Sequence, residues 1–227
     1  MDRNYRSIAI DGPSGAGKST LARLAAQALG FLYVDTGAIY RSVGLIALRA
    51  GLSPGDGDAV AALLPGIHLE LCHGKDGLQR MYVNGEDVTG ELRRPEVSSY
   101  ASGVSAIPGV RAFLLDMQRD IAQKNDVVMD GRDIGTVVLP RADVKVFLSA
   151  SPEERAARRF EELKARGDGS SYGEVLAQIE LRDKNDSSRQ VAPLKAAEDA
   201  VFLDTTGLPL EESLARLLRI IRGKLGL

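Results

Sequence analysis

The sequence predicts an α/β protein built on a doubly wound parallel sheet, with a small antiparallel β insertion. Short apolar runs alternate with helical stretches along most of the chain, which is typical of a parallel sheet covered by helices. One region, from about Ile67 to Gly103, breaks this alternation. With 227 residues, 44% of them hydrophobic, the chain is long enough to bury one core of generous size. We therefore expect a single domain over residues 1–227 with an insertion at residues 66–103.

The first quarter of the chain predicts the order strand, helix, strand, helix. Ser7–Ile10 is a short apolar run, as expected for a buried strand. A helix is expected to begin near Lys18 and to end at Gly30, a residue favoured after a helix terminus. Phe31–Val34 predicts a second strand, and Ala38–Ala50 a second helix.

The insertion is predicted from two strand-like segments, IHLEL and QRMYV, followed by the Asn-Gly turn signal of VNGED. The glycine-rich segment Ser53–Asp58 before it predicts a loop. After the insertion, strands and helices alternate again. The expected strands are Val127–Met129, Val144–Leu148 and Val201–Leu203, and the expected helices are Val110–Gln123, Pro152–Ala165, Tyr172–Arg182 and Glu211–Lys224.

Composition excludes several classes of protein. The net charge of −2 gives no general attraction to nucleic acid or to an anionic membrane. Cys72 is the single cysteine, so no intrachain disulfide can form, which suits a reducing compartment. No apolar run approaches the ~20 residues that a membrane-spanning helix needs, and the N-terminus lacks the apolar segment of a signal peptide. We expect a cytoplasmic protein and, since nothing in the sequence demands more, a monomer.

The strongest functional signal is a glycine-rich loop between the first strand and the first helix. It fits the pattern G-x-x-x-x-G-K-[ST] in full and stands in the required context. Glycines let several backbone N–H groups point at anionic oxygens, and the helix start adds its positive dipole end. Lys18 can reach the β- and γ-phosphates, and the Ser19 hydroxyl can bind Mg²⁺. The expected ATP-binding residues are Gly12, Pro13, Ser14, Gly15, Ala16, Gly17, Lys18, Ser19 and Thr20.

This loop indicates a nucleoside triphosphate as phosphate donor but not the class of enzyme, because GTPases, ATPases and small-molecule kinases share it. The chain contains no Asn-Lys pair, which the guanine-reading segment of a GTPase would need. Arginines and aspartates follow the ends of expected strands, where ligands bind in doubly wound sheets. Arginine offers a fixed, charged fork for phosphate oxygens, so several of them around a phosphate loop suggest a second phosphate-bearing ligand.

Five segments together resemble the bacterial cytidylate kinase family. They are DGPSGAGKST, DTGAIYR, RPEVSSYASGVSAIPGVR, DGRDIGT and RDKNDSSRQVAPL, and they cover nearly the whole chain in the order of the family. The resemblance implies a P-loop kinase core in which residues 66–103 serve the acceptor and a mobile lid spans about residues 152–172. It also implies transfer of the γ-phosphoryl group of ATP to CMP or dCMP with Mg²⁺.

The resemblance also implies roles for individual residues. Thr36, Arg41, Arg132 and Arg189 would hold the acceptor phosphate, where positive charge offsets the repulsion between two phosphate anions. Ser102, Arg111 and Asp133 would read the cytosine ring through its amino group and its acceptors. Arg182 and Asp186 would hold the sugar.

Catalysis is assigned to Lys18, Arg132 and two lid arginines, Arg155 and Arg158. Cations placed before the reaction stabilise charge spread over the phosphoryl oxygens. Asp130 would orient a water on Mg²⁺, beside Ser19. No general base is demanded, since the acceptor is already a phosphate oxygen.

Two alternatives remain open at the level of sequence. The chain can be a related kinase for UMP, AMP or shikimate, and a purine acceptor would not need the trio Ser102, Arg111 and Asp133. It can also be an ATP-dependent switch or a nucleic-acid-associated ATPase without a phosphoryl acceptor. ATP turnover without any monophosphate would favour that second alternative.

Overall fold

The computed structural model describes residues 5–74, 76–165 and 167–227. The chain divides into two compact units. The first unit combines Met1–Tyr33 with Ala122–Leu227, and the second is Val34–Ile121. Among the described residues, no helix has both the length and the apolar character that a membrane span requires.

The predicted parallel sheet is confirmed. It has five strands in the order β2-β6-β1-β7-β8. The central strand β1 pairs in parallel with β6, with Ser7 opposite Val127, and with β7, with Ile8 opposite Val144. The strands are β1 Ser7–Asp11, β2 Leu32–Asp35, β6 Val127–Gly131, β7 Val144–Ser149 and β8 Val201–Asp204. Because β1 is central, the residues that follow it reach the middle of the carboxyl edge of the sheet.

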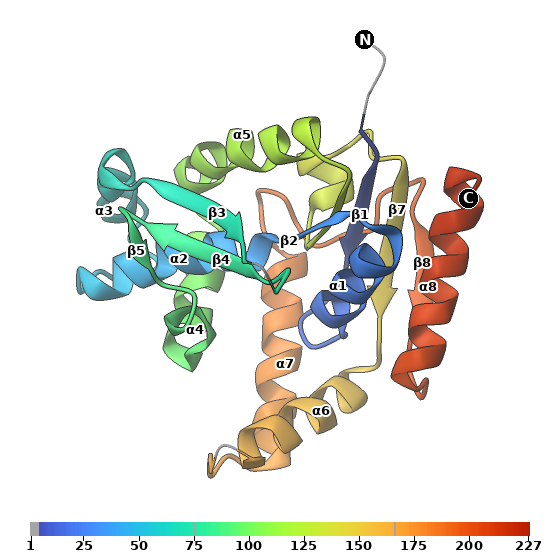
Figure 1. Ribbon diagram of the computed structural model, residues 1–227. Helices are drawn as coiled ribbons and strands as arrows, with labels where there is room; N and C mark the ends of the chain where they lie inside the picture. The colour runs from blue at the N-terminus through green and yellow to red at the C-terminus, as the bar shows by residue number, and fades with distance from the viewer. Residues whose placement is uncertain (1–4, 75, 166) are drawn as a thin grey trace. The chain divides into compact units, whose positions relative to one another are not determined.

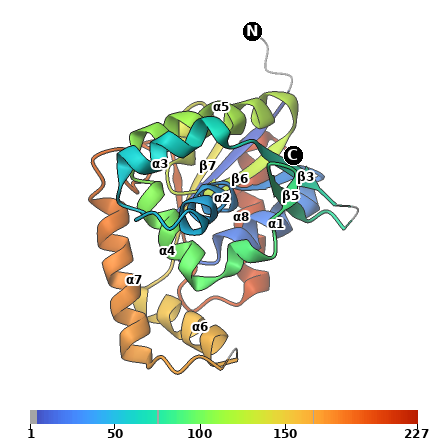
Figure 2. The same ribbon diagram turned by 90° about the vertical axis from the view of Figure 1, so that its left-hand side faces the viewer.

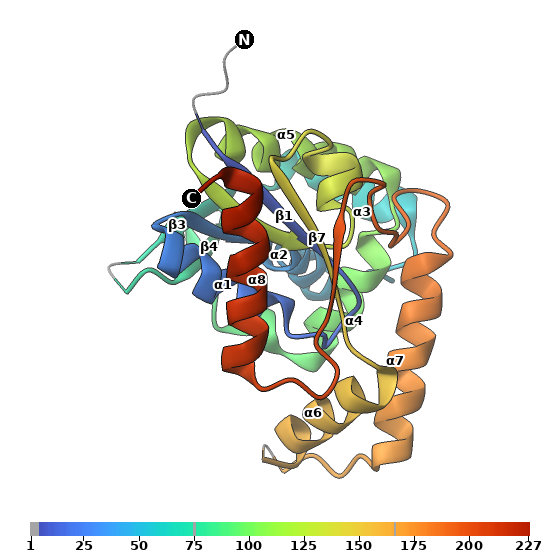
Figure 3. The same ribbon diagram turned by 90° about the vertical axis from the view of Figure 1, so that its right-hand side faces the viewer.

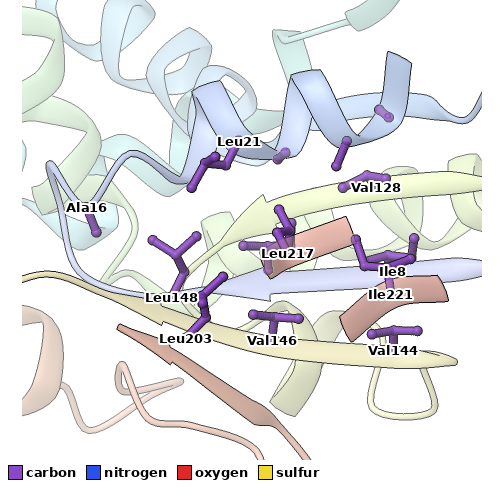
Figure 4. Close-up of a cluster of buried hydrophobic side chains, with 14 residues drawn as sticks. Ile8, Ala16, Leu21, Val128, Val144, Val146, Leu148, Leu203, Leu217 and Ile221 are labelled. Atoms are coloured by element: carbon purple, nitrogen blue, oxygen red, sulfur yellow. The ribbon is translucent and has the colours of Figure 1, made fainter. Parts of the chain in front are cut away.

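Helices of the first unit flank this sheet. Figure 1 and Figure 3 show α1 and α8 beside each other, with α8 running along β7. Their apolar stripes bury one continuous core against the sheet, in which Leu21 of α1 and Leu217 of α8 meet Val146 and Leu148 of β7 (Figure 4). The helices are α1 Lys18–Leu29, α6 Pro152–Ala165, α7 Tyr172–Ser187 and α8 Leu210–Leu225, with a short π-helical turn η3 at Ile134–Val138.

The second unit contains the predicted antiparallel insertion, a three-stranded sheet in the order β3-β4-β5. The Asn-Gly turn is confirmed: Asn84 and Gly85 have φ values of 52° and 83° and connect β4 to β5. In Figure 2 helix α2 lies beside α4. The two helices can pack closely because Gly44 has no side chain, and a Cβ atom at this position would clash with the backbone of Ala101. The elements are α2 Thr36–Arg49, α3 Gly57–Leu63, η1 Leu64–Gly66, β3 Leu69–His73, β4 Gln79–Val83, β5 Glu86–Asp87, η2 Glu91–Arg93, α4 Pro95–Val104 and α5 Pro108–Lys124.

Three expectations about local structure were wrong. Ser53–Asp58 is not all loop, because Asp56 caps a helix that begins at Gly57 by accepting from Ala59 N at 3.1 Å. The antiparallel structure ends at Asp87, and α4 occupies the end of the expected insertion.

The third difference concerns the helix that was expected to end at Arg182. Helix α7 continues to Ser187 and carries both Arg182 and Asp186. Helix α6, in contrast, has the predicted bounds.

Candidate functional site

The glycine-rich loop runs from the end of β1 to the start of α1, as predicted. Gly12, Gly15 and Gly17 have positive φ values of 151°, 75° and 83°, which side chains disfavour. A Cβ atom on Gly12 would lie 1.9 Å from the carbonyl oxygen of Leu148 in β7. Gly17 is the N-cap of α1 and has no side chain to cap the first turn, so the helix start is suited to an anion.

Lys18 lies at the first position of α1, and its side chain turns back over the loop. Its Nζ donates a hydrogen bond to the carbonyl oxygen of Pro13 at 2.7 Å, and only 5% of the residue is exposed. Burial, followed by the positive charge of Arg132, holds the pKa of the Lys18 ammonium well below its usual value. Arg182 acts in the same direction. An anionic ligand bound at the loop would relieve the repulsion between Lys18 and these arginines.

Ser19 and Asp130 are paired at the mouth of the loop. Ser19 Oγ donates to Asp130 Oδ2 at 3.0 Å, and the Tyr33 hydroxyl donates to Asp130 Oδ1 at 2.8 Å. Asp130 belongs to β6, next to β1 in the sheet, so the sheet itself brings the carboxylate to the loop. A hydroxyl oxygen and a carboxylate beside a phosphate loop are the hard oxygen donors that Mg²⁺ prefers. This pair of residues fits a magnesium ion bound together with nucleotide phosphates.

Asp11, the last residue of β1, anchors the segment that follows β6. Its carboxylate accepts hydrogen bonds from Ile134 N and Gly135 N, each at 2.7 Å. Burial raises the pKa of the Asp11 carboxyl to about 6. These two bonds fix the turn that carries Arg132 and Asp133 between β6 and η3.

Asp186 gathers two of the predicted acceptor arginines. Its Oδ2 accepts from Arg132 Nε at 2.9 Å, and its Oδ1 pairs with Arg189 Nη2. Burial works against the charge of this carboxylate, but Arg132 and Arg189 outweigh it and hold its pKa below the usual value. The structure therefore brings Arg132, Asp186 and Arg189 together in the first unit. Arg182 lies on α7 four residues before Asp186, and Asp133 is buried directly before η3.

The two predicted lid arginines of α6 have different surroundings. Arg158 is part-exposed, pairs with Glu154 and lies at the loop, since a Cβ atom on Gly17 would be 3.6 Å from its Nη1. Arg155 is buried and bonded to Ser14, Ala150 and Asp183. Of the two, Arg158 is thus the one presented to a ligand of the loop.

The remaining predicted residues belong to the second unit. Thr36 is the first residue of α2, and Asp35 is its N-cap. Asp35 Oδ1 accepts from Ala38 N at 3.0 Å, while Oδ2 accepts from Arg41 Nη2 at 2.6 Å. The carboxylate therefore fixes both the start of the helix and the direction of the Arg41 guanidinium.

Ser102 and Arg111 are linked through one serine. Ser105 Oγ donates to the carbonyl oxygen of Ser102 at 2.9 Å, and Ser105 O accepts from Arg111 Nη1 at 3.2 Å. The Arg111 guanidinium also lies 5.6 Å from the centre of the Tyr40 ring, within cation–π range. The end of α4 and the start of α5 thus carry two of the three residues expected to read the base.

Several residues of this machinery were missed by the sequence analysis. Gln79 of β4 pairs with the backbone of Asp35: its Oε1 accepts from Asp35 N at 2.8 Å, and its Nε2 donates to Asp35 O at 3.2 Å. Tyr33 and Asp183 were missed as well. Gln79 and Tyr33 stand in no recognisable motif, and Asp183 lies in RDKNDSSRQVAPL but was given no role there. The roles of all three depend on partners far away in the chain.

Comparison with known proteins decides the family. The family model for cytidylate kinase matches residues 8–223, which is nearly the whole chain. The chain belongs to the cytidylate kinase family. It is therefore an enzyme, a kinase, and the predicted resemblance is confirmed.

Two relatives illustrate how closely the chain follows this family. The cytidylate kinase of Caldicellulosiruptor bescii is 49% identical over 214 residues, which cover 94% of each chain. The cytidylate kinase of an Exiguobacterium species is 51% identical over 214 residues, covering 94% of this chain and 95% of the relative. A solved structure of an uncharacterized protein from Eubacterium ventriosum has a TM-score of 0.54 at 14% identity and covers 97% of this chain and 99% of its own, a likeness of fold alone.

Proposed function

We propose that this kinase transfers the γ-phosphoryl group of ATP to CMP or dCMP, producing ADP and CDP or dCDP. One observation carries the proposal beyond the family name. Gly131 stands opposite Asp11 in the register of β6 and β1, so Arg132, assigned to the acceptor phosphate, leaves the sheet beside Gly12, where the phosphate loop begins. Cations for a donor and for an acceptor phosphate are therefore neighbours within one unit.

On the donor side, we assign ATP to Gly12–Ser19 and Thr20. The loop amides and the start of α1 would hold the phosphates, and Lys18 would exchange its bond to Pro13 O for phosphate oxygens. Bound phosphates would also restore the ammonium charge that burial disfavours. Arg158, beside Gly17, would stabilise charge on the transferring phosphoryl group.

On the acceptor side, we assign the CMP phosphate to Thr36, Arg41, Arg132 and Arg189. The donor and acceptor phosphates repel each other strongly in a site that excludes water. Positively charged side chains are therefore needed beside both phosphates before they can approach. The bond that Arg41 donates to Asp35 and the bonds that Arg132 and Arg189 donate to Asp186 hold these guanidinium groups in fixed directions. Fixed forks lose little entropy when a phosphate binds.

We assign the base and the sugar to residues of α4, α5, α7 and the turn after β6. Asp133 would accept from the cytosine amino group, and Ser102 and Arg111 would donate to the ring acceptors. Uracil presents the opposite pattern at that edge and would leave buried groups unpaired. Arg182 and Asp186 would hold the sugar.

We assign Mg²⁺ to Ser19 directly and to Asp130 through water. When bound, the ion neutralises charge on the transferring phosphates. The protein supplies position and electrostatics, and the lid, about residues 152–172, would exclude water so that ATP is not hydrolysed. The cytoplasmic location and the monomeric state stay predictions.

The test is an ADP-release assay with ATP and Mg²⁺, in which CMP, dCMP, UMP, AMP, dTMP and shikimate are compared side by side. We expect fast turnover with CMP and dCMP only. Turnover with another acceptor would keep the kinase and overturn the assignment of Ser102, Arg111 and Asp133. ATP turnover that no acceptor stimulates would overturn the proposal in favour of an ATPase.

A further inference from the structure

The guanidinium of Arg155 joins three segments of the first unit. Its Nη1 donates to the carbonyl oxygen of Ser14 in the phosphate loop at 3.0 Å. Its Nε donates to Ala150 O, directly after β7, at 2.9 Å. Its Nη1 and Nη2 also donate to the two carboxylate oxygens of Asp183 in α7, at 3.1 and 2.5 Å. A bidentate pair of this kind fixes both the position and the plane of the guanidinium.

Burial makes Asp183 essential to this arrangement. Only 3% of the Arg155 side chain is exposed, whereas 25% of the Asp183 side chain is exposed. A guanidinium stays protonated in proteins, so a buried one is costly unless a counter-charge lies against it. Asp183 supplies that charge at low cost, because water still reaches part of its carboxylate. Without Asp183 the guanidinium would tend to leave its place beside Ser14.

The bond to Ser14 matters because of the geometry of the peptide group. In a planar trans peptide, the C=O of one residue and the N–H of the next point in opposite directions. Holding Ser14 O toward Arg155 therefore directs the N–H of Gly15 away from it, and such amides are the phosphate ligands of this kind of loop. The loop also lies directly against Arg155, since a Cβ atom on Gly15 would be in van der Waals contact with Arg155 Cβ at 3.4 Å.

The contacts from Ser14 through Arg155 to Asp183 form a relay. Its other end is α7, which carries residues assigned to the acceptor. Asp183 stands on α7 between Arg182 and Asp186, and Asp186 holds Arg132 and Arg189. A shift of α7 on binding the acceptor would thus move the carboxylate that orients Arg155. The relay connects the helix that would sense CMP with the peptide that would bind ATP.

We propose that Asp183 is a positioning residue that acts through Arg155: it orients the Ser14–Gly15 peptide for ATP and couples ATP binding to acceptor binding. The first part, the orientation of the Ser14–Gly15 peptide, concerns only the binding of ATP at the phosphate loop. The coupling rests on the proposed function, because it requires CMP as the acceptor.

The first measurement is the affinity for a non-hydrolysable ATP analogue with Mg²⁺, by calorimetry and without any acceptor. Asp183→Asn is compared with Glu180→Gln, which removes the same charge from an exposed position of the same helix. We expect Asp183→Asn to weaken binding about tenfold and Glu180→Gln to bind like the wild type. Unchanged affinity in Asp183→Asn would overturn the positioning role.

The second measurement is the affinity for CMP with and without the ATP analogue. We expect the wild type to bind CMP at least about fivefold more tightly when the analogue is present. Asp183→Asn should lose most of this enhancement, whereas Glu180→Gln should keep it. An enhancement of equal size in Asp183→Asn would overturn the coupling. If no protein binds CMP at all, the proposed function fails, while the result with the ATP analogue still decides the role of Asp183.

A double-mutant comparison separates this relay from a general loss of fold. Arg155→Met removes the buried charge, so Asp183→Asn in that background no longer leaves an unpaired guanidinium. If Asp183 acts through Arg155, the second substitution should change ATP-analogue affinity little in the Arg155→Met protein. Additive losses would show that Asp183 acts independently and would overturn the relay. Thermal unfolding of each variant identifies any protein that is not folded at the assay temperature, and Asp183→Glu, which keeps the charge, should restore part of the affinity.

Discussion

The carboxylate of Asp186 accepts a hydrogen bond from Arg132 Nε at 2.9 Å, with only 1% of the Asp186 side chain exposed. Its other oxygen pairs with Arg189. The family resemblance implies that Asp186 holds the sugar, but in the structure its carboxylate already holds two arginines assigned to the acceptor phosphate. Orienting these arginines is therefore a role that Asp186 has before any ligand binds.

Asp186→Asn should weaken acceptor binding more than ATP binding. The variant loses the negative charge that holds Arg132 and Arg189, and breaking a buried ion pair costs about 3 kcal/mol or more of unfolding free energy. Urea unfolding and steady-state kinetics with CMP and ATP varied in turn measure both effects. The exposed control Glu180→Gln should change neither, and an equal rise of KM for both substrates would contradict the assignment.

Lys18→Ala should abolish transfer with little change in the fold. We expect kcat to fall by about 10³-fold, since one cation aimed at the transferring group is lost. The unfolding free energy should stay level or rise, because burial already disfavours the ammonium charge. A coupled ADP assay and thermal unfolding test this, with Lys164→Ala on the exposed side of α6 as the control. Retained transfer would remove Lys18 from the mechanism.

Asp133→Ala should harm the use of CMP far more than the binding of ATP. A site built to accept a hydrogen bond from the cytosine amino group loses that recognition, so we expect KM for CMP to rise by about 10²-fold. ATP-analogue affinity should stay near the wild-type value. Comparable losses for both ligands would mean that the buried carboxylate has a structural role instead.

Gln79→Leu should raise KM for CMP without affecting ATP. The substitution leaves Asp35 N and Asp35 O without their partners in Gln79, at a cost of about 1–3 kcal/mol. It should therefore loosen the start of α2, the helix that carries Thr36 and Arg41. Gln79→Glu still accepts from Asp35 N and should lie between the wild type and Gln79→Leu. A CMP KM that is unchanged in Gln79→Leu would rule out this support.

Asp11 should make the stability of the wild type fall as the pH rises from about 4 to 6. Its carboxyl has a pKa of about 6 in the folded chain against 3.8 ordinarily, so the folded state keeps its proton longer than the unfolded state does. The stabilisation is fully present below the ordinary pKa and is lost as the pH passes the folded one, a difference of about 3 kcal/mol.

Urea unfolding of the wild type and of Asp11→Asn across this range checks the sign. Asn carries no titrating proton, so the wild type should lose stability relative to the variant between pH 4 and pH 7. Parallel curves for the two proteins would contradict the raised pKa.

Local signals explain which elements could be predicted. The start of α6 follows from Pro152 at its first position, and both of its bounds match the prediction. The loop at Gly12–Ser19 was predictable because its backbone conformation dictates its residues. Helix α3 was missed because its capping residue, Asp56, stands in a segment whose glycines dominated the pattern. The extension of α7 to Ser187 depends on partners elsewhere, since Asp183 and Asp186 pair with Arg155 and Arg132.

The same distinction applies to the candidate site. Residues in compact motifs, such as Lys18 and Asp133, could be named from the sequence with a proposed role. The environment of Arg155 could not, because its counter-charge stands on the following helix and its third partner stands in the phosphate loop. Sequence patterns show which charges a chain carries, while burial and pairing decide which of them a ligand can meet.

The close approach of Gly12 to Leu148 has a consequence for the evolution of such chains. At this position the end of β7 excludes a side chain without any nucleotide being bound, since a Cβ atom would stand 1.9 Å from a backbone oxygen. A descendant that lost its enzymatic activity would be released from selection at Lys18, yet folding alone would still require glycine at position 12. In a degenerate relative, survival of the first glycine is therefore no sign of a working enzyme, whereas survival of the lysine is.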